Sequence, residues 1–287
     1  MTLFQILIGF LLLLSWAERP FLYKPAAKYF PSALSAAFTS TWLMAALIIT
    51  FPWLGHLLTD NYKSVFTSPY LIISVYKGVS LYWLIKLQQE VNKESTSSSV
   101  FLSFISLALG SLVNNLFFGE GLGCIKILCI IGFGILGVVF LYKGDAKRLS
   151  VSGKIAFAMV TLIMSSYQVS DHLCIPHIGW YPYLLFTSIF MFVTGLFHGV
   201  TKTDFKNMFC NKKIASAGAF YAVSEFLVIY ASINILPVSV VQVFLRLAVP
   251  VVMIVSALRY KEQSIKNQIV FGVAALGLAL PIILLKN

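Results

Sequence analysis

Charged side chains are scarce in this sequence of 287 residues: 21 are Lys or Arg and 10 are Asp or Glu, which together make 11%. Water-soluble domains carry about a quarter charged residues because their surfaces face water. Here 59% of residues are hydrophobic and the mean hydropathy is +0.88, so most of the surface has no polar covering. The composition excludes an ordinary soluble fold and indicates that lipid surrounds most of the chain.

Cysteine is also infrequent, and its spacing excludes a metal cluster. Cys124, Cys129, Cys174 and Cys210 lack the paired short spacings of a zinc site, and three of them lie in or beside apolar segments. We therefore expect no disulfide framework, no metal and no cofactor.

The sequence lacks the parts of a nucleotide-driven machine. It contains no GxxxxGK[ST] loop and no polar segment long enough to fold as a soluble domain. The net charge of +11 comes from short basic clusters between apolar runs, without a continuous basic stripe, so no nucleic-acid partner is expected. The first 17 residues have no basic n-region and no cleavage site, which predicts a retained membrane helix in place of a secretory signal.

Apolar runs of about 20 residues, the length that a spanning helix needs, occur ten times. They are continuous instead of alternating, which predicts helices. The fold class that follows is all-α integral membrane, with ten transmembrane helices. The runs cover residues 3–27, 32–54, 69–88, 98–118, 122–142, 154–173, 179–199, 214–234, 237–258 and 266–285. Between them, 143–154 and 202–213 are rich in charged turn formers, and 92–99 is rich in N-cap residues.

The loop charges support ten spans. Lys and Arg near span ends collect in the cytoplasm, and with ten spans one side takes 15 of them and the other side takes three. The larger set is Lys24, Lys28, Lys86, Lys93, Lys143, Lys147, Arg148, Lys154, Lys202, Lys206, Lys212, Lys213, Arg259, Lys261 and Lys266. The smaller set is Lys63, Lys126 and Lys286. This distribution puts both termini outside the cytoplasm.

The two halves of the chain share a plan. An apolar span ends at Glu120 in the first half and at Glu262 in the second, and the next span carries glycines with GxxxxG spacing. These glycines are Gly132 and Gly137, then Gly272 and Gly277. Chance similarity between apolar sequences is the alternative. Two copies of five spans, 1–143 and 144–287, must enter the membrane in opposite directions, which is the inverted-repeat architecture of secondary transporters.

These features resemble the EamA-type branch of the drug/metabolite transporter superfamily. Further matches are Trp16-Ala17 in span one, the Y-x-x-x-D from Tyr167 to Asp171 in span six, and the stretch 230–250, which contains Arg246. The sequence departs from the family where Leu107 or Ala108 stands opposite Pro250. Family members are usually drawn with cytoplasmic termini, contrary to the loop charges, so the orientation stays open. The resemblance implies a multi-pass transporter with two five-helix repeats.

Ionisable side chains within a span cost about 2.5 kcal/mol or more at the bilayer centre, so each needs a partner, a cavity or a role. Glu18 and Arg19 interrupt span one, and Pro20 should free backbone carbonyls toward a cavity. Glu18 resembles the span-one glutamate of the small multidrug branch, which implies a substrate- or proton-binding carboxylate. Alternatively, span one ends at Ala17 and leaves both charges among the headgroups.

Span six contains the most polar stretch inside the predicted membrane. Gln168, Asp171 and His172 are three or four residues apart and can share one helical face with Tyr167 nearby. A position at the membrane interface is the alternative.

Glu225 in span eight and Arg246 in span nine lie near mid-depth. An arginine there can grip a carboxylate or phosphate at two points, and Gln242 one turn earlier shares its face. A structural pair of Arg246 with Glu225 or Asp171 is the alternative. Lys77 in span three is a similar candidate nearer a span end. The predicted substrate-binding residues are Glu18, Arg19, Lys77, Tyr167, Gln168, Asp171, Glu225, Gln242 and Arg246.

Other side chains fit structural roles better. Glu120 and Glu262 lie at the ends of spans four and nine, where they mark the repeated plan of the fold and are not predicted to bind substrate. Several aromatic residues could surround an organic solute, although packing or interface belts explain most of them. They are Tyr76, Tyr82, Trp83, Phe101, Phe104, Tyr221 and Phe244.

We predict a secondary transporter, not an enzyme, that moves a small polar or zwitterionic organic metabolite by alternating access. Amino acids, nucleotide-like metabolites and cationic drugs all fit, and a proton gradient or exchange would drive transport. The alternative is an integral-membrane lipid-modifying enzyme, for which Asp171-His172 is the candidate pair. The expected partners are the lipid bilayer, the metabolite and protons, and the expected state is a monomer in a bacterial inner membrane.

Overall fold

The computed structural model describes residues 2–26, 32–66, 69–119, 122–262 and 264–285. Within these ranges, side chains are described except at 26, 32–33, 35, 58–65, 167–168 and 238–239. Every regular element in this part of the chain is a helix, and no strand occurs there. The prediction of an all-α fold is confirmed.

Ten helices of 18 residues or more run through the described ranges. They are α1 (Leu3–Ala26), α2 (Ser32–Val65), α3 (Tyr70–Glu94), α4 (Thr96–Phe118), α5 (Cys124–Lys143), α6 (Val151–Ile178), α7 (Trp180–Phe197), α9 (Lys212–Asn234), α10 (Val238–Tyr260) and α11 (Ile265–Leu284). Most follow the predicted spans within a few residues. Two short elements lie in connections that were expected to be turns, the 3-10 helix η1 (Asp145–Arg148) and α8 (Lys202–Cys210).

Nine of the helices in the described ranges are long and apolar enough to cross a membrane. The protein therefore has the character of a multi-pass membrane protein. The exception is α6, which contains the polar stretch singled out in the sequence. With 28 residues it is still about 42 Å long at 1.5 Å per residue, so its composition and not its length sets it apart.

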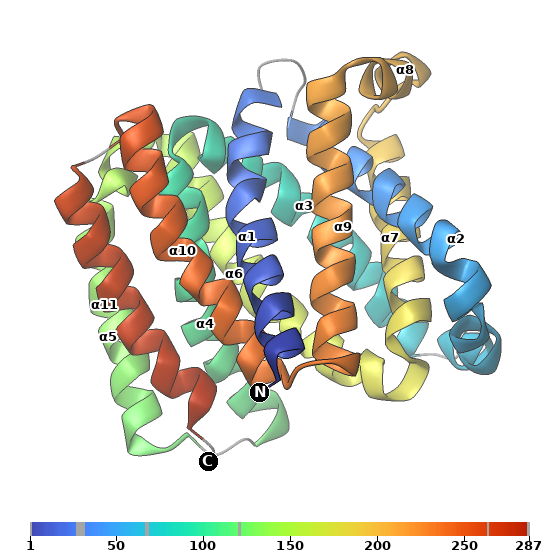
Figure 1. Ribbon diagram of the computed structural model, residues 1–287, viewed down its shortest axis with the longest axis horizontal. Coiled ribbons are helices and arrows are strands. Elements are labelled where there is room, and N and C mark those ends of the chain that lie inside the picture. The colour runs from blue at the N-terminus through green and yellow to red at the C-terminus, as the bar shows by residue number, and fades with distance from the viewer. Residues whose placement is uncertain (1, 27–31, 67–68, 120–121, 263, 286–287) are drawn as a thin grey trace.

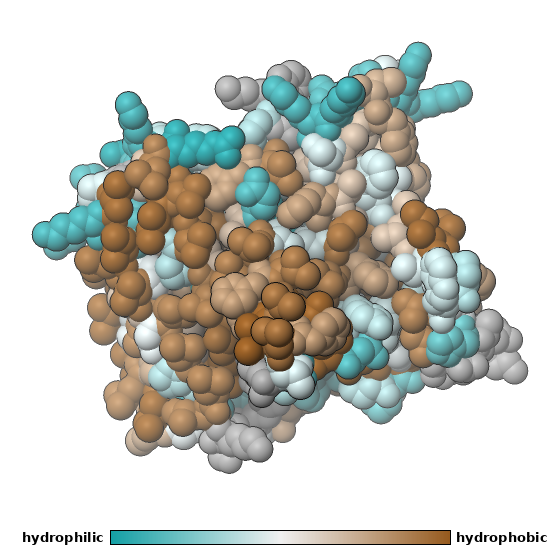
Figure 2. All heavy atoms as spheres, viewed as in Figure 1, coloured by the Kyte–Doolittle hydropathy of each residue, from teal (hydrophilic) through white to brown (hydrophobic). Residues whose placement is uncertain are grey.

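Many large apolar side chains face outward, whereas in a soluble protein most of them face the core. Among the nine candidate spans, α5 has the highest mean hydropathy, 2.7. It is also the least buried of them, because only 22% of its most apolar stretch lies inside the protein. Large apolar side chains of α5 and α11 lie on the outside, among them Leu128, Ile135 and Val270. Figure 2 shows this apolar surface over the middle of the molecule, with hydrophilic side chains gathered along one edge. Such a surface requires lipid around it.

Polar side chains fix where several helices begin. Ser95 accepts a hydrogen bond from Ser98 N at the start of α4, Ser150 does the same from Gly153 N at α6, and Ser264 from Asn267 N at α11. These caps satisfy backbone donors that the first turn leaves unpaired. The N-cap-rich segment 92–99 was predicted to start a helix, and Ser95 confirms it.

The helices run nearly side by side and alternate in direction, and the first and last described residues lie at the same end of the bundle (Figure 1). α5 and α11 form one flank of the molecule, and α2 and α7 form the other. The connections at the end opposite the termini carry most of the basic residues, including those of η1, α8 and the start of α9. We call this the basic end. Lys28, Lys286 and the Lys63 side chain lie outside the described part.

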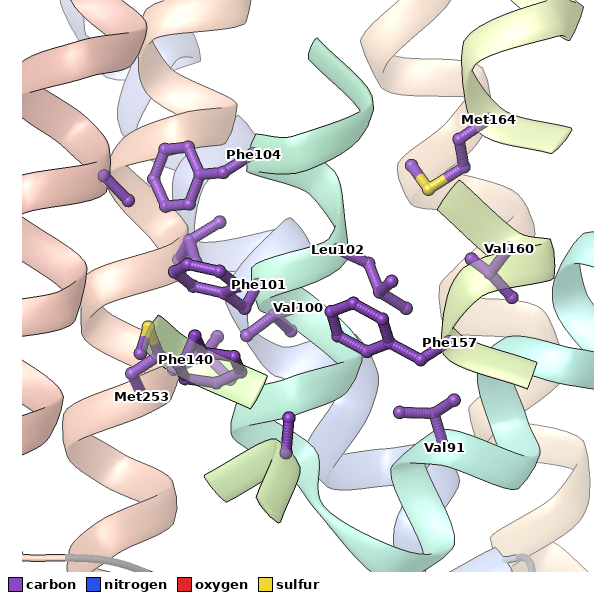
Figure 3. Packing of buried hydrophobic residues seen from close by; sticks show 14 of the residues in the cluster. Val91, Val100, Phe101, Leu102, Phe104, Phe140, Phe157, Val160, Met164 and Met253 are labelled. Carbon is purple, nitrogen blue, oxygen red and sulfur yellow. The ribbon is translucent and has the colours of Figure 1, made fainter. Parts of the chain in front are cut away.

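The interior is built around the first half of α4, from which Val100, Phe101, Leu102 and Phe104 project into the largest buried apolar cluster. Phe101 stacks on Phe140 of α5 with ring centroids 3.9 Å apart. Figure 3 shows these side chains meeting Phe157 of α6 and Met253 of α10. Two of the residues considered for a solute cage, Phe101 and Phe104, are therefore fully buried packing residues.

Candidate functional site

α1 carries Arg19 into the bundle. The helix continues through Pro20 to Ala26, so neither the predicted break at Pro20 nor the alternative end at Ala17 is observed. Side chains of α3 hold this part of α1: Asn92 Nδ2 donates to the Pro20 carbonyl at 3.1 Å, and Gln89 Nε2 donates to the Tyr23 carbonyl at 2.9 Å. Arg19 therefore sits within a helix and not in a loop.

The Arg19 guanidinium forms a buried ion pair with α9. Its Nη1 lies 2.7 Å from Glu225 Oε1, and its Nε donates to the hydroxyl of Ser224. Two aromatic rings cover it: its Cζ lies 3.8 Å from the ring centroid of Trp16 and 4.2 Å from that of Tyr221. The side chain of Arg19 is 7% exposed and that of Glu225 is 25% exposed.

A second ion pair joins α3 and α6. Lys77 Nζ lies 2.8 Å and 2.9 Å from the two carboxylate oxygens of Asp171. The lysine side chain is 7% exposed, whereas that of Asp171 is 35% exposed. Both members were predicted site residues, but the sequence offered no reason to pair them with each other.

The two ion pairs lie at neighbouring interfaces. α1 packs on α9 and also contacts α3, which packs on α6. Charges separated by a low-dielectric interior influence each other over longer distances than they would in water. Four of the predicted residues, Arg19, Glu225, Lys77 and Asp171, thus form one charged group between α1, α9, α3 and α6.

Arg246 follows a different arrangement from the alternative considered for it. The salt bridges of Glu225 and Asp171 run to Arg19 and Lys77, whereas the structural alternative paired either carboxylate with Arg246. Arg246 Nη2 instead donates to Gln242 Oε1 at 3.4 Å, which confirms that these two residues share a face of α10. Arg246 is buried, with 5% exposure.

The remaining predicted residues are not gathered at the ion pairs. Glu18 is exposed on α1, and its charge acts on Tyr260 of α10. The ring of His172 packs on Phe118 with centroids 4.2 Å apart, while its neighbour Asp171 binds Lys77. The side chains of Tyr167 and Gln168, and all of Glu120, lie outside the described part of the structure.

Only one of the aromatic cage candidates touches an ionic site residue in the contacts described here. Tyr221 covers Arg19, whereas Tyr82 and Trp83 pack on His198, and Phe244 packs on Phe10. Tyr76 donates a hydrogen bond to Ser166 at 2.7 Å. The sequence did not predict Trp16 and Ser224 as contacts of Arg19. Trp16 lies about one helical turn before Arg19, and Ser224 directly precedes Glu225, which was a predicted site residue.

A polar network at the basic end was also unforeseen. Glu262 accepts hydrogen bonds from the backbone N–H groups of Thr96 and Ser97 at 2.9 Å and 3.1 Å, and Lys24 Nζ lies 2.5 Å from it. Asp145 accepts from the Ser97 hydroxyl and from Gln268 Nε2. Glu262 closes α10 as predicted, but it also holds the start of α4, because a carboxylate stabilises the N-terminus of a helix.

Open recesses lie away from the ion pairs. One of about 380 Å³ is lined by Leu109 and Val113 of α4 and by Leu162, Ile163, Ser165 and Ser166 of α6. None of the predicted site residues lines it. The charged group is thus not part of this recess.

Compared with known proteins, the sequence matches no family model, and no curated protein is similar enough to count as a relative. The function has to be argued from the geometry.

Proposed function

We propose that this chain is a secondary transporter of the EamA type, which carries a small polar or zwitterionic organic metabolite by alternating access between two inverted halves. The observation that carries the proposal is the pair of interior salt bridges, Arg19–Glu225 and Lys77–Asp171, each of which has a buried cation and joins one half of the chain to the other. Buried ion pairs add little to stability relative to apolar packing, so their presence in a membrane interior favours a role in moving charge or cargo.

The helix packing supports the inverted repeat. If α1 to α5 correspond to α6, α7, α9, α10 and α11, the larger interfaces between the halves should have counterparts when the halves are exchanged. The contact of α1 with α9 matches that of α6 with α3, and the contact of α1 with α10 matches that of α6 with α4. The contacts of α2 with α7, α4 with α10 and α5 with α11 map onto themselves.

The positions of the termini support ten crossings. An even number of crossings returns the chain to its starting side, and the first and last described residues lie at one end of the bundle (Figure 1). In this proposal α6 also crosses the membrane and completes the ten crossings. Asp171 of α6 binds Lys77, and Ser165 and Ser170 are buried.

The two salt bridges occupy equivalent interfaces, because the exchange of halves relates the contact of α1 with α9 to that of α6 with α3. Arg19 lies seven residues before the last residue of α1, Ala26, and Asp171 lies seven residues before the last residue of α6, Ile178. The exchange of halves therefore relates a cation on α1 to an anion on α6, with their partners on α9 and α3 reversed in sign. We assign both pairs to the contacts that separate when the halves move.

This arrangement gives alternating access a physical basis. Separating either pair exposes two charges that have lost their partners, which is costly in a low-dielectric interior. A solute that carries charges of both signs can pair with the exposed cation and the exposed anion, whereas a proton neutralises only the carboxylate. Opening is thus tied to the arrival of solute or proton, and no nucleotide motor is needed.

The alternative function is a lipid-modifying enzyme with Asp171 and His172 as its catalytic pair. Both residues make other contacts in the structure. Asp171 binds Lys77, and the ring of His172 lies on Phe118. Neither contact prepares a nucleophile or an acid–base pair.

Transport is tested with purified protein in liposomes. We expect saturable uptake of at least one solute from a panel of amino acids, nucleotide-like metabolites and organic cations, and counterflow when the liposomes are preloaded with the same solute. Recovery of the solute chemically unchanged separates transport from enzymology. Non-saturating flux would indicate a channel, and conversion of added lipid without any flux would favour the enzyme.

The topology is tested by labelling single cysteines from one side of the membrane after removal of the native ones. Positions at the two ends of α6, for example Ser150→Cys and Gly179→Cys, should react from opposite sides. Reaction of both from the same side would remove α6 as a span. The side that labels Ser150→Cys also gives the orientation.

A further inference from the structure

The guanidinium of Arg19 has one nitrogen that the described part of the protein leaves unused. Nε donates to Ser224 and Nη1 to Glu225, but Nη2 is buried and has no hydrogen-bond partner among the described residues. The residue as a whole is only 6% exposed. A buried charged donor without an acceptor is costly, and native proteins keep very few of them. A ligand that supplies the missing acceptor would account for it.

The surroundings of Arg19 restrict what that ligand can be. Because the rings of Trp16 and Tyr221 cover the guanidinium, the edge that carries Nη1 and Nη2 is the part left to bind. Two parallel N–H donors at this edge match the two oxygens of a planar carboxylate. The aromatic rings also supply apolar walls for the rest of an organic molecule.

Glu225 already places a carboxylate at this edge, but in a less complete way. Its Oε1 accepts from Nη1 alone, and its side chain is 25% exposed, compared with 7% for Arg19. An incoming carboxylate that spans Nη1 and Nη2 would make one hydrogen bond more than Glu225 does. Glu225 is thus the accessible and replaceable partner in the pair.

The charge balance of the group decides what else the ligand must carry. Arg19 and Lys77 contribute two positive charges and Glu225 and Asp171 two negative ones. A carboxylate entering alone would leave Glu225 without a cation in the interior. A ligand that brings its own ammonium restores the balance and gives the displaced Glu225 a partner.

We propose that the site takes an amino-acid-type zwitterion, with its carboxylate on the Nη1–Nη2 edge of Arg19 between Trp16 and Tyr221, and its ammonium on Glu225. This assignment rests on the proposed transport function and names its substrate class. It also moves the carboxylate-gripping role from Arg246, where the sequence suggested it, to Arg19.

The binding test uses the purified full-length protein and the twenty L-amino acids, each added in a thermal-shift titration, because a ligand of the folded form raises the melting temperature. For the amino acid that binds most tightly, the corresponding decarboxylated amine and deaminated acid are titrated in parallel. We expect the amine and the acid each to bind at least tenfold more weakly than the amino acid.

Three variants connect binding to the residues. Arg19→Lys keeps the charge but loses the fork, and it should weaken binding at least tenfold. Arg259→Lys, at an exposed arginine at the end of α10, is the matched control and should bind as the unmodified protein does. Glu225→Gln leaves Arg19 in place, so it keeps the test informative if Arg19→Lys does not fold. It should reduce the preference for the amino acid over its deaminated acid.

The proposal is overturned if no amino acid stabilises the protein, if the decarboxylated amine binds as well as the amino acid, or if Arg19→Lys binds normally. Counterflow in liposomes separates this failure from failure of the transport function. A solute without a carboxylate that is carried equally well by Arg19→Lys would overturn the zwitterion site and leave the transporter standing. The absence of any carried solute would overturn the transporter itself.

Discussion

Lys77 and Asp171 form the more asymmetric of the two interior salt bridges: the ammonium is 7% exposed, and the carboxylate that binds it through both oxygens is 35% exposed. The two partners therefore depend on each other unequally. Loss of the carboxylate removes an anionic partner from a buried cation, whereas loss of the lysine leaves a carboxylate that is still partly accessible.

Substitution of these residues should show that inequality. Asp171→Leu should destabilise the protein by about 3 kcal/mol or more, because it takes the bound carboxylate away from a buried cation. Lys77→Met should cost less, and the double variant should be more stable than Asp171→Leu alone. Melting temperatures of the four proteins in one detergent form the double-mutant cycle.

A surface pair provides the control for this cycle. Lys93 and Glu90 are 3.3 Å apart, and both are substantially exposed. Lys93→Met should change stability by less than about 1 kcal/mol, as is typical of exposed ion pairs. Equal effects of Lys93→Met and Asp171→Leu would mean that burial of Lys77 has no energetic consequence.

Gly78 should not tolerate a methyl group. A Cβ on this residue of α3 would lie 2.5 Å from Phe190 Cβ and 2.8 Å from the Thr187 carbonyl oxygen of α7. Because part of this contact is backbone, the two helices must separate to make room. Gly78→Ala should therefore lower the melting temperature clearly, although alanine is the better helix former.

Gly134 of α5 is the matched control for Gly78. A Cβ there meets nothing within 4 Å, so Gly134→Ala should leave the melting temperature unchanged or raise it slightly. If both alanine variants behave alike, the close approach of α3 and α7 is not as described.

Glu262 should stabilise the protein through the start of α4. Glu262→Ala removes the acceptor of the Thr96 and Ser97 N–H groups and leaves Lys24 without its carboxylate. Because these groups are buried, we expect a loss of about 1–3 kcal/mol, measured by thermal unfolding. Glu94 caps α6 in a similar way from an exposed position, so Glu94→Ala should cost less because water can replace it.

Asp145 should make stability depend on pH. Burial at the basic end, with a smaller effect of Glu262, raises the pKa of its carboxyl above the ordinary value of 3.8. A raised pKa in the folded state means that the folded form holds its proton more tightly than the unfolded form. The stabilisation is complete below about pH 3.8 and is lost as the pH rises through the raised pKa.

Asp145→Asn removes that titration while keeping an oxygen that accepts from Ser97 and Gln268. The difference in melting temperature, that of the variant minus that of the unmodified protein, should therefore increase as the pH is raised from 4 to 8. Parallel melting curves across this range, with a constant difference between the two proteins, would contradict the prediction.

Much of the helical layout was predictable from hydropathy because apolar run length and helix length are linked in a membrane. Most span boundaries agree within a few residues, and Ser95 caps α4 where the composition suggested a helix start. The limits of α2 were not predictable in this way. Its helix continues to Val65 through a polar segment, because backbone hydrogen bonding does not end where the hydropathy falls.

The sequence could show which charged residues belong to the candidate site, but it could not show which of them form ion pairs with each other. Arg19, Lys77, Asp171 and Glu225 stood out because an ionisable side chain inside an apolar run is costly wherever the run lies. Which cation meets which carboxylate depends on the rotation of each helix and on contacts between residues about 94 and 206 positions apart. For the same reason the sequence left the partner of Arg246 open between Glu225 and Asp171.

The sequence by itself determined that the chain is helical, that its surface is apolar, and which few charges need an explanation, because these properties follow from composition and from periodicity along one segment. The tertiary structure alone decided that Arg19 faces Glu225 between two aromatic rings, that Lys77 faces Asp171, and that Glu262 holds the start of α4. Those contacts arise only when helices from the two halves pack together, since a single helix carries no information about the face that its neighbour presents.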